Sequence, residues 1–254
     1  TDLIAREAGK FIDEHRDKPF LMYVAFNAPH YPMQAPERLR AMYANLPKQR
    51  ADYAPLVAGL DEAIGKIMDR LRQNKLDRDT LVFFASDNGA SIEARAGGGG
   101  GNNGPYRGFK FSLFDGGIHM PGIVSWPAVL PKNETRGQLS IAMDIFPTIA
   151  EAIGAALPKD RTIDGKSWMP LLKDPKAAGH ESLCWSSGKQ DAVRYGSWKL
   201  VRNGREEATA SQPDSSDKAA DVVLSDLQAD PGEKTNVALQ HPDLVKKMIA
   251  MHDQ

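Results

Sequence analysis

The chain has 254 residues, and its 32 lysines and arginines nearly balance its 33 aspartates and glutamates, for a formal net charge of -1. This balance leaves no basic field of the kind that attracts nucleic acid, and no apolar run approaches the roughly 18 residues that a membrane-spanning helix needs. The length allows one large α/β domain or two smaller ones. The single cysteine, Cys184, cannot form an internal disulfide, and we expect it to pack as a small buried side chain.

The first 90 residues alternate between helical and strand-like patterns. Apolar residues recur on one helical face over residues 2–15 and, most regularly, over residues 50–74. Continuous apolar runs at 20–26 and 81–85 are typical of strands buried on both faces. Because strand, helix and strand in this order form the crossover unit of a parallel sheet, both strands should end at the same edge.

Polar residues follow both of these strands at the point where each one ends. His30 comes after the first strand, in a turn stiffened by two prolines, and Asp87 and Asn88 come directly after the second. Enzymes with α/β folds hold ligand-binding side chains at this edge of the sheet. The same residue types are common in tight turns, so the sequence leaves open whether Asp87 and Asn88 bind a ligand or only form a turn.

The rest of the chain changes from a glycine-rich to a strand-rich pattern. Residues 94–108 contain five successive glycines and predict a mobile loop, which lacks the spacing of a phosphate-binding P-loop. A short strand at 122–126 and a helix at 143–153 follow. Beyond residue 180 the pattern predicts an antiparallel sheet and a last helix: strands at 182–186, 192–195, 198–201 and 222–224, an exposed hairpin tip at 205–220, and a helix at 242–252.

Six stretches resemble, in the same order, segments of the sulfatase family of the alkaline-phosphatase-like superfamily. They are KPFLMYVAFNAPHYPMQAP, TLVFFASDNG, PYRGFKFSLFDGGIHMPGIVSWP, MDIFPTIAEAIG, DGKSWMPLL and LSDLQADPGEKTNVALQHPDLV. The resemblance implies an α/β fold with a mostly parallel sheet flanked by helices, followed by a smaller antiparallel sheet plus a helix. It also implies a division into part of the catalytic domain, residues 1–178, and a small carboxyl-terminal subdomain, residues 179–254.

The resemblance assigns roles to five residues. Asp87 and Asn88 match a metal-binding pair, and their hard oxygen atoms suit Ca²⁺ or Mg²⁺. Lys110 and His30 match active-site residues: the lysine would bind a sulfate oxygen, and the histidine would protonate the leaving alkoxide. Arg107 lies in the same matched stretch and would hold the loop or an anionic substrate. From the residues alone, Lys110 could instead be a solvated lysine and His30 a turn residue.

The sequence also departs from the family pattern. Sulfatases carry a Cys-x-Pro-x-Arg motif whose cysteine becomes formylglycine, and an acidic pair that completes the metal site; neither is present in this sequence. Cys184 lies in LCWSSGK, without the proline or the arginine, so we do not expect it to be the nucleophile. Asp115 and His119 stand where the family more often has Glu-Gly-Gly-x-Arg. We therefore expect the carboxyl-terminal portion of a sulfatase, inactive alone, whose formylglycine belongs to a missing amino-terminal segment.

The resemblance also predicts partners and a location. The substrate would be a sulfate ester, such as a sulfated glycan or an aryl sulfate, and the missing segment or another protomer would complete the site. Two other functions stay open: a phosphonate or phosphodiester hydrolase of the same superfamily, and a non-catalytic module that binds a sulfated glycan or a partner chain. A periplasmic or secreted location follows from the family and not from the residues.

Overall fold

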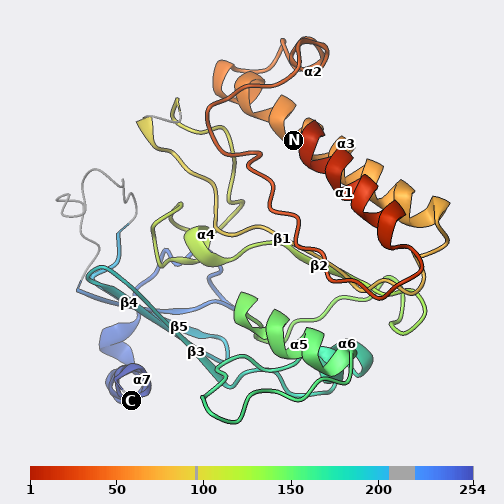
Figure 1. Cartoon of the computed structure of the whole chain (residues 1–254). Helices are drawn as coiled ribbons and strands as arrows, with labels where there is room; N and C mark the ends of the chain where they lie inside the picture. Colours follow the sequence, from red (N-terminus) through yellow and green to blue (C-terminus); the bar gives the residue numbers. More distant parts are fainter. Residues whose placement is uncertain (95–96, 206–220, 254) are drawn as a thin grey trace.

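Two long helices form one end of the molecule in the computed structural model, which describes residues 1–94, 97–205 and 221–253. α1 (Asp2–His15) and α3 (Lys48–Gln73) lie side by side, and the short α2 (Glu37–Met42) contacts α3 (Figure 1). Small and aliphatic side chains form the core between the long helices: Ala5, Ala8, Ile12, Ala63, Ile67 and Leu71. Alanines let the two helices approach closely, and both predicted helices are confirmed within two residues at each end.

Residues 20–26 run extended along these helices but form no strand ladder within the part of the chain that the structure describes. Alternate side chains pack against the helical core: Phe20, Met22, Val24 and Phe26. The side chains between them face away, with Leu21 73% and Tyr23 91% exposed. The prediction of a paired strand is wrong here, because an apolar run does not reveal whether a neighbouring strand lies along either edge.

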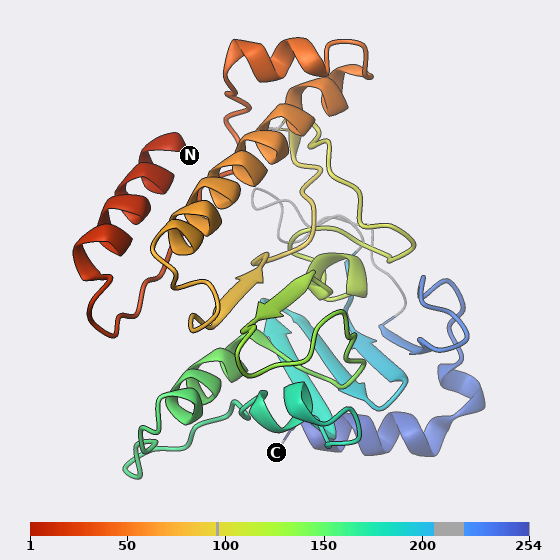
Figure 2. The same cartoon turned by 90° about the vertical axis from the view of Figure 1, so that its right-hand side faces the viewer.

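A two-stranded sheet of β1 (Val82–Ala85) and β2 (Gly122–Ser125) lies next to the helices (Figure 2). Both strands were expected from their apolar runs, but they pair antiparallel, with Val82 opposite Ser125 and Ala85 opposite Gly122. Among the described residues, neither the parallel crossover into β1 nor a mostly parallel sheet is formed. A run of apolar residues predicts a strand but carries no information on the direction of its partner.

The carboxyl-terminal part is a four-stranded antiparallel sheet with a terminal helix, as the sequence predicts. The strands lie in sequence order: β3 (Ser182–Ser187), β4 (Gln190–Tyr195), β5 (Trp198–Arg202) and β6 (Val222–Asp226). One face, with Val193, Leu200 and Leu224, packs on α7 (Pro242–His252). The other face packs on Leu113 and Phe114, which lead into the single-turn helix α4 (Asp115–Ile118). This sheet therefore supports the segment that follows Lys110.

Short helices connect these parts around one buried carboxylate. η2 (Ala142–Asp144), α5 (Ile145–Ala152) and α6 (Met169–Lys173) follow β2, and η3 (Ala238–Gln240) precedes α7. Asp144 is fully buried and accepts four hydrogen bonds of 2.8–2.9 Å, from Ile141 N, Lys166 N, Trp168 Nε1 and His180 Nε2. Saturating a buried carboxylate in this way offsets the loss of its hydration.

Some smaller expectations concern the cysteine, the hairpin tip and the domain boundary. Cys184 lies on the edge strand β3 and is exposed, not buried as predicted, because only one neighbouring strand covers it. The hairpin tip predicted at 205–220 falls, apart from Arg205, outside the described residues. The division after residue 178 stays a prediction. Among the described helices, none combines the length and apolar composition that crossing a bilayer requires.

Candidate active site

His30 and Lys110 lie 80 residues apart in the sequence and meet in the structure, with Lys110 Nζ 3.4 Å from His30 Nε2. His30 Nδ1 lies 2.8 Å from Tyr31 O. Because a carbonyl oxygen only accepts hydrogen bonds, Nδ1 carries a proton, and the neutral ring presents its Nε2 lone pair to the lysine ammonium. The structure thus brings these two residues together, and their catalytic roles stay predictions.

Tight backbone turns place the Lys110 side chain. Gly108 has a φ of +81°, and a Cβ there would lie 2.5 Å from Ser112 Oγ, so glycine is required. Phe111 has a φ of 75°, which is rare for a bulky residue, and backbone strain of this kind gathers at functional sites. The Lys110 N–H donates to Ala90 O at 2.9 Å, which fixes the lysine beside the segment that follows β1.

Asn103 joins the lysine segment to the end of β1, a role for which the sequence gives no signal. Its Oδ1 accepts a hydrogen bond from Ala90 N at 2.8 Å, and its Nδ2 donates to Gly108 O at 2.9 Å. Asparagine in a glycine-rich stretch usually indicates a turn, so its type alone does not predict a bridge between segments. Asn103 thus ties the described part of the loop predicted to be mobile to the segment that follows β1, just before Lys110.

Asp87 and Asn88 form the turn that follows β1. Asn88 N donates to Asp87 Oδ1 at 3.0 Å, and Asn88 Nδ2 donates to Gly89 O at 2.9 Å. The second Asp87 oxygen and Asn88 Oδ1 have no hydrogen-bond partner among the described residues. These two hard oxygens fit Ca²⁺ or Mg²⁺, but no group of three His, Cys, Asp or Glu side chains surrounds a metal position in the described part of the chain. The turn therefore fits one part of a metal site.

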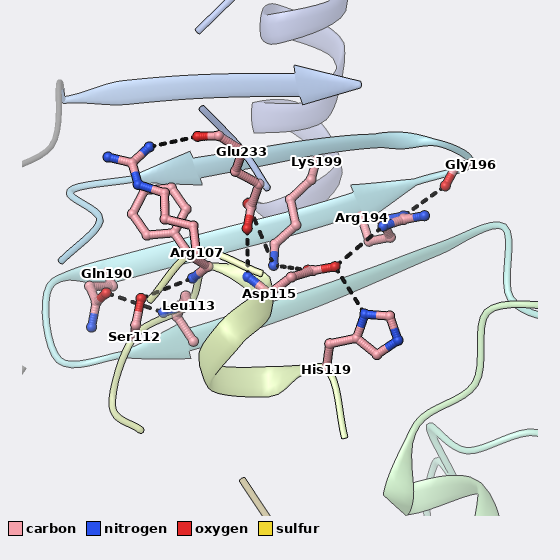
Figure 3. Close-up of polar contacts among 11 residues, drawn as sticks. Arg107, Ser112, Leu113, Asp115, His119, Gln190, Arg194, Gly196, Lys199 and Glu233 are labelled. Carbon is pink, nitrogen blue, oxygen red and sulfur yellow. Dashed lines mark hydrogen bonds and ion pairs between the residues drawn. The ribbon is translucent and has the colours of Figure 1, made fainter. Parts of the chain in front are cut away.

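A buried cluster of charged side chains supports the segment after Lys110 (Figure 3). The Lys199 ammonium of β5 is 1% exposed, bonds to Asp115 Oδ1 and lies 3.9 Å from Glu233 Oε1. The Asp115 N–H donates to Glu233 Oε2 at 2.6 Å. His119 Nδ1 and Arg194 Nη1 lie 3.3 and 3.8 Å from Asp115 Oδ2. The cluster links α4 to the carboxyl-terminal sheet, which the sequence could not show because Asp115 and Lys199 are 84 residues apart.

The two carboxylates of this cluster have pKa values shifted in opposite directions. Burial would raise the pKa of Asp115, but its hydrogen bond with His119 and the charge of Lys199 outweigh burial and hold that pKa well below its ordinary value. Burial raises the pKa of Glu233 to about 6, because attraction to Lys199 opposes it only in part. Asp115 is therefore the main counter-charge of Lys199.

Arg107, the third predicted substrate-binding residue, lies at this cluster. Its Nη1 donates to Glu233 O at 3.0 Å, and its guanidinium carbon lies 4.0 Å from the centroid of the Phe114 ring (Figure 3). Nearby, Gln190 of β4 donates to Phe111 O at 2.8 Å and accepts from Leu113 N at 3.3 Å. Arg107 thus ties the lysine segment to the loop between β6 and η3, while Gln190 ties it to the carboxyl-terminal sheet. The contact of Arg107 with substrate stays a prediction.

Cys184 has the surroundings of an unreactive thiol. Its Sγ lies 3.7 Å from Met251 O in the carboxyl-terminal part, and although the residue is exposed, partial desolvation by its neighbours raises the pKa of the thiol. The thiolate is the reactive form, so a raised pKa makes this cysteine a poor nucleophile. The surroundings of Cys184 are consistent with its predicted exclusion from the chemistry.

Comparison with curated proteins identifies close relatives over part of their length. A profile described as Sulfatase matches residues 1–155. Human arylsulfatase D is 36% identical over 187 residues, which are 72% of this chain and 31% of that protein. Rat steryl-sulfatase is 40% identical over 175 residues, which are 68% of this chain and 30% of that protein. The chain thus spans about a third of the length of these relatives.

A solved structure shows the same fold over nearly the whole chain. Ps i-CgsB, in complex with k-i-k-neocarrahexaose, matches 98% of this chain and 53% of its own chain, with 29% identity and a TM-score of 0.82. This match confirms the alkaline-phosphatase-like α/β class, although β1 and β2 pair antiparallel. With the profile covering more than half of its residues, the chain belongs to the sulfatase family.

Proposed function

We propose that this chain carries the sulfate-binding part of a sulfuric ester hydrolase. The proposal rests on the 3.4 Å approach of Lys110 Nζ to His30 Nε2 in a chain of the sulfatase family. The Lys110 ammonium has weak partners, the imidazole nitrogen and the Phe111 ring 5.2 Å away, and is available to an anion because a sulfate oxygen is a stronger partner than either. The sulfate of the substrate would therefore displace Nε2 from the ammonium.

The proposed reaction uses water to cleave the S–O bond of a sulfate ester, and it releases an alcohol and inorganic sulfate. Lys110 would hold one sulfate oxygen as a compact positive charge. With Nδ1–H held by Tyr31 O, His30 would take up a proton from solvent at Nε2 once the sulfate has displaced that nitrogen from the ammonium, and would pass this proton to the bridging oxygen as the alcohol leaves. The bond between Nδ1 and Tyr31 O keeps the ring oriented with Nε2 toward the lysine and the bound anion.

The other groups that the reaction needs are proposed to come from two sources. Asp87 and Asn88 would hold Ca²⁺ or Mg²⁺, which when bound draws negative charge from the sulfate oxygens. A segment outside this sequence, or another protomer, would add the remaining metal ligands and the formylglycine nucleophile. We therefore expect the 254-residue chain to be inactive by itself, and a periplasmic or secreted location stays a prediction.

Calorimetric titration of the chain with inorganic sulfate tests the proposal. Replacing Lys110→Met should weaken sulfate binding about tenfold or more, because one charge-assisted hydrogen bond is lost. The exposed Lys132→Met change removes the same charge elsewhere and should leave the affinity unaltered. Equal sulfate affinities for the wild type and Lys110→Met would contradict the proposal.

The two alternative functions predict different ligands or reactions from those of the proposed sulfuric ester hydrolase. A phosphonate or phosphodiester hydrolase should bind phenylphosphonate more tightly than sulfate, through the same Lys110. A non-catalytic module should bind sulfate but give no turnover of 4-nitrophenyl sulfate when fused to a family segment that carries Cys-x-Pro-x-Arg. Turnover by that fusion, abolished by Lys110→Met, is the outcome that the proposal requires.

A further inference from the structure

The single-turn helix α4 contacts both backbone turns of the candidate active site. Gly89 N, which directly follows the proposed metal ligands, donates to Gly117 O of α4 at 3.0 Å. Gly116 N of α4 donates at 2.6 Å to Arg107 O, in the segment that leads to Lys110. One short helix therefore joins the turn that follows β1 to the turn that carries the lysine.

These contacts are made by backbone atoms, with no side chain between them. A Cβ on Gly89 would overlap Gly116 O. A Cβ on Gly116 would overlap Gly108 O, and a Cβ on Gly117 would overlap Ser112 O. Because closely packed backbone leaves no flexible group to absorb a shift, a displacement of α4 displaces both turns.

The position of α4 depends on its neighbours, because a helix of four residues is too short to be stable alone. Leu113 and Phe114 pack on the carboxyl-terminal sheet, but apolar contacts have no preferred direction. Asp115 supplies directional bonds: its Oδ1 accepts from the Lys199 ammonium, and its N–H donates to Glu233 Oε2 at 2.6 Å (Figure 3). Charge-assisted bonds of this kind fix the orientation of α4 against β5.

We propose that Asp115 is a positioning residue of the proposed sulfate site. By anchoring α4 to β5, it sets the position of the Lys110 ammonium relative to the turn that follows β1, and it does so without contacting the substrate. The proposal rests on the proposed function, because it takes Lys110 as the group that binds sulfate. It differs from a purely structural role, since loss of the anchor should weaken anion binding by molecules that remain folded.

Calorimetric titration of the 254-residue chain with inorganic sulfate tests this role on two matched variants. Asp115→Asn keeps the size of the side chain but removes its charge, and it should weaken sulfate binding about fivefold or more. Asp144→Asn changes another buried carboxylate, whose described partners lie outside α4 and the Lys110 segment, and it should leave the affinity unaltered. Circular dichroism gives the folded fraction of each variant, and the affinities are corrected for it.

Nuclear magnetic resonance supplies a signature that does not require sulfate to bind. The ¹⁵N chemical shift of His30 Nε2 reports the contact of this nitrogen with the Lys110 ammonium. That shift should change in Asp115→Asn and stay constant in Asp144→Asn, because only the first variant releases α4.

Hydrogen exchange of the wild-type chain tests the common support without any variant, and it decides the question if Asp115→Asn does not fold. The amides of Gly89, Lys110 and Gly116 donate across the contacts around α4. If α4 supports both turns, these amides should exchange through one opening, with the same dependence on urea. Different urea dependences would show that the turns are held separately, and would overturn the proposal.

The outcomes separate the positioning role from the proposed function. If both aspartate variants weaken sulfate binding equally, or if Asp115→Asn changes neither the sulfate affinity nor the His30 shift, Asp115 has only a structural role. If Lys110→Met leaves the sulfate affinity unchanged while Asp115→Asn still moves the His30 shift, the proposed hydrolase function fails and the positioning of Lys110 by Asp115 stands.

Discussion

Lys110 and Lys199 are two lysines of one chain with opposite surroundings. Lys199 is buried between Asp115 and Glu233, so its charge is matched inside the protein. Lys110 is only partly buried and has weak partners, the His30 nitrogen at 3.4 Å and the Phe111 ring at 5.2 Å. A buried charge must be paired to be tolerated, whereas an accessible charge with a weak partner can accept a ligand. The same side chain thus stabilises the fold at one position and is suited to bind an anion at the other.

Of the changes considered, Lys199→Met should lower the free energy of unfolding most. It removes the buried cation between two carboxylates and leaves Asp115 with His119 and Arg194 as its remaining partners; removing one partner of a buried pair costs about 3–5 kcal/mol. Urea unfolding followed by circular dichroism measures the change. The exposed Lys176→Met control should stay within about 0.5 kcal/mol of the wild type. A loss below about 1 kcal/mol for Lys199→Met would mean that the cluster does not hold α4 to the sheet.

The free energy of unfolding should depend on pH through Glu233, because Lys199 offsets the burial of Glu233 less than it offsets that of Asp115. The pKa of Glu233 is raised from 4.5 to about 6, so below pH 4.5 the carboxyl is protonated in both states. As pH rises through 6, the folded protein must charge a buried group, and the free energy of unfolding falls by about 2 kcal/mol. Glu233→Gln removes this slope, so a difference between variant and wild type that stays constant from pH 4 to 7 would refute the assignment.

Calcium should change the free energy of unfolding less, because the turn at Asp87 and Asn88 supplies only two oxygen ligands. We expect a dissociation constant of roughly 10⁻⁴ to 10⁻³ M for the chain alone. At about 1 mM Ca²⁺ the free energy of unfolding then rises by about 1 kcal/mol, and Asp87→Ala should abolish that gain. Asp79→Ala, another exposed carboxylate, is the control. Submicromolar calcium binding that survives Asp87→Ala would place the metal elsewhere.

The smallest stability effect should come from Lys110→Met. Its ammonium has two weak contacts, with His30 Nε2 and with the Phe111 ring, so the free energy of unfolding should change by less than about 0.5 kcal/mol. An unchanged stability would strengthen the contrast between Lys110 and Lys199, since Lys110→Met is expected to weaken sulfate binding. A loss above about 1.5 kcal/mol would show Lys110 to be a structural residue like Lys199.

The sequence predicts those parts of the fold that depend on neighbouring residues. The periodicity of α1 and α3 is a local signal that the structure confirms. Gly188 and Gly196, with φ values of +61° and +57°, form the tight turns between β3, β4 and β5, and turn glycines of this kind are also a local signal. The direction of β1 pairing is not local, because it depends on where β2 returns 40 residues later. Strand patterns report the burial of a residue and not its partner.

The candidate site also contains some residues that the sequence predicts and others that it does not. His30 and Lys110 were found through their matched segments, and the structure brings them together. Asn103 was missed, because its bridging bonds depend on a loop conformation that glycine composition leaves undetermined. The partners of Lys199 come from α4 and the loop before α7, so no short pattern could connect them.

The outward side of residues 20–26 bears on how the chain behaves in concentrated solution. Leu21 and Tyr23 face solvent, and Ile123 of β2 is 61% exposed. In the described structure the backbone of this extended segment lacks ladder partners, and such a segment is a template for pairing with another chain. The apparent molecular mass measured by light scattering should therefore rise with protein concentration. Purification and calorimetry consequently call for dilute samples, in which self-association does not compete with ligand binding.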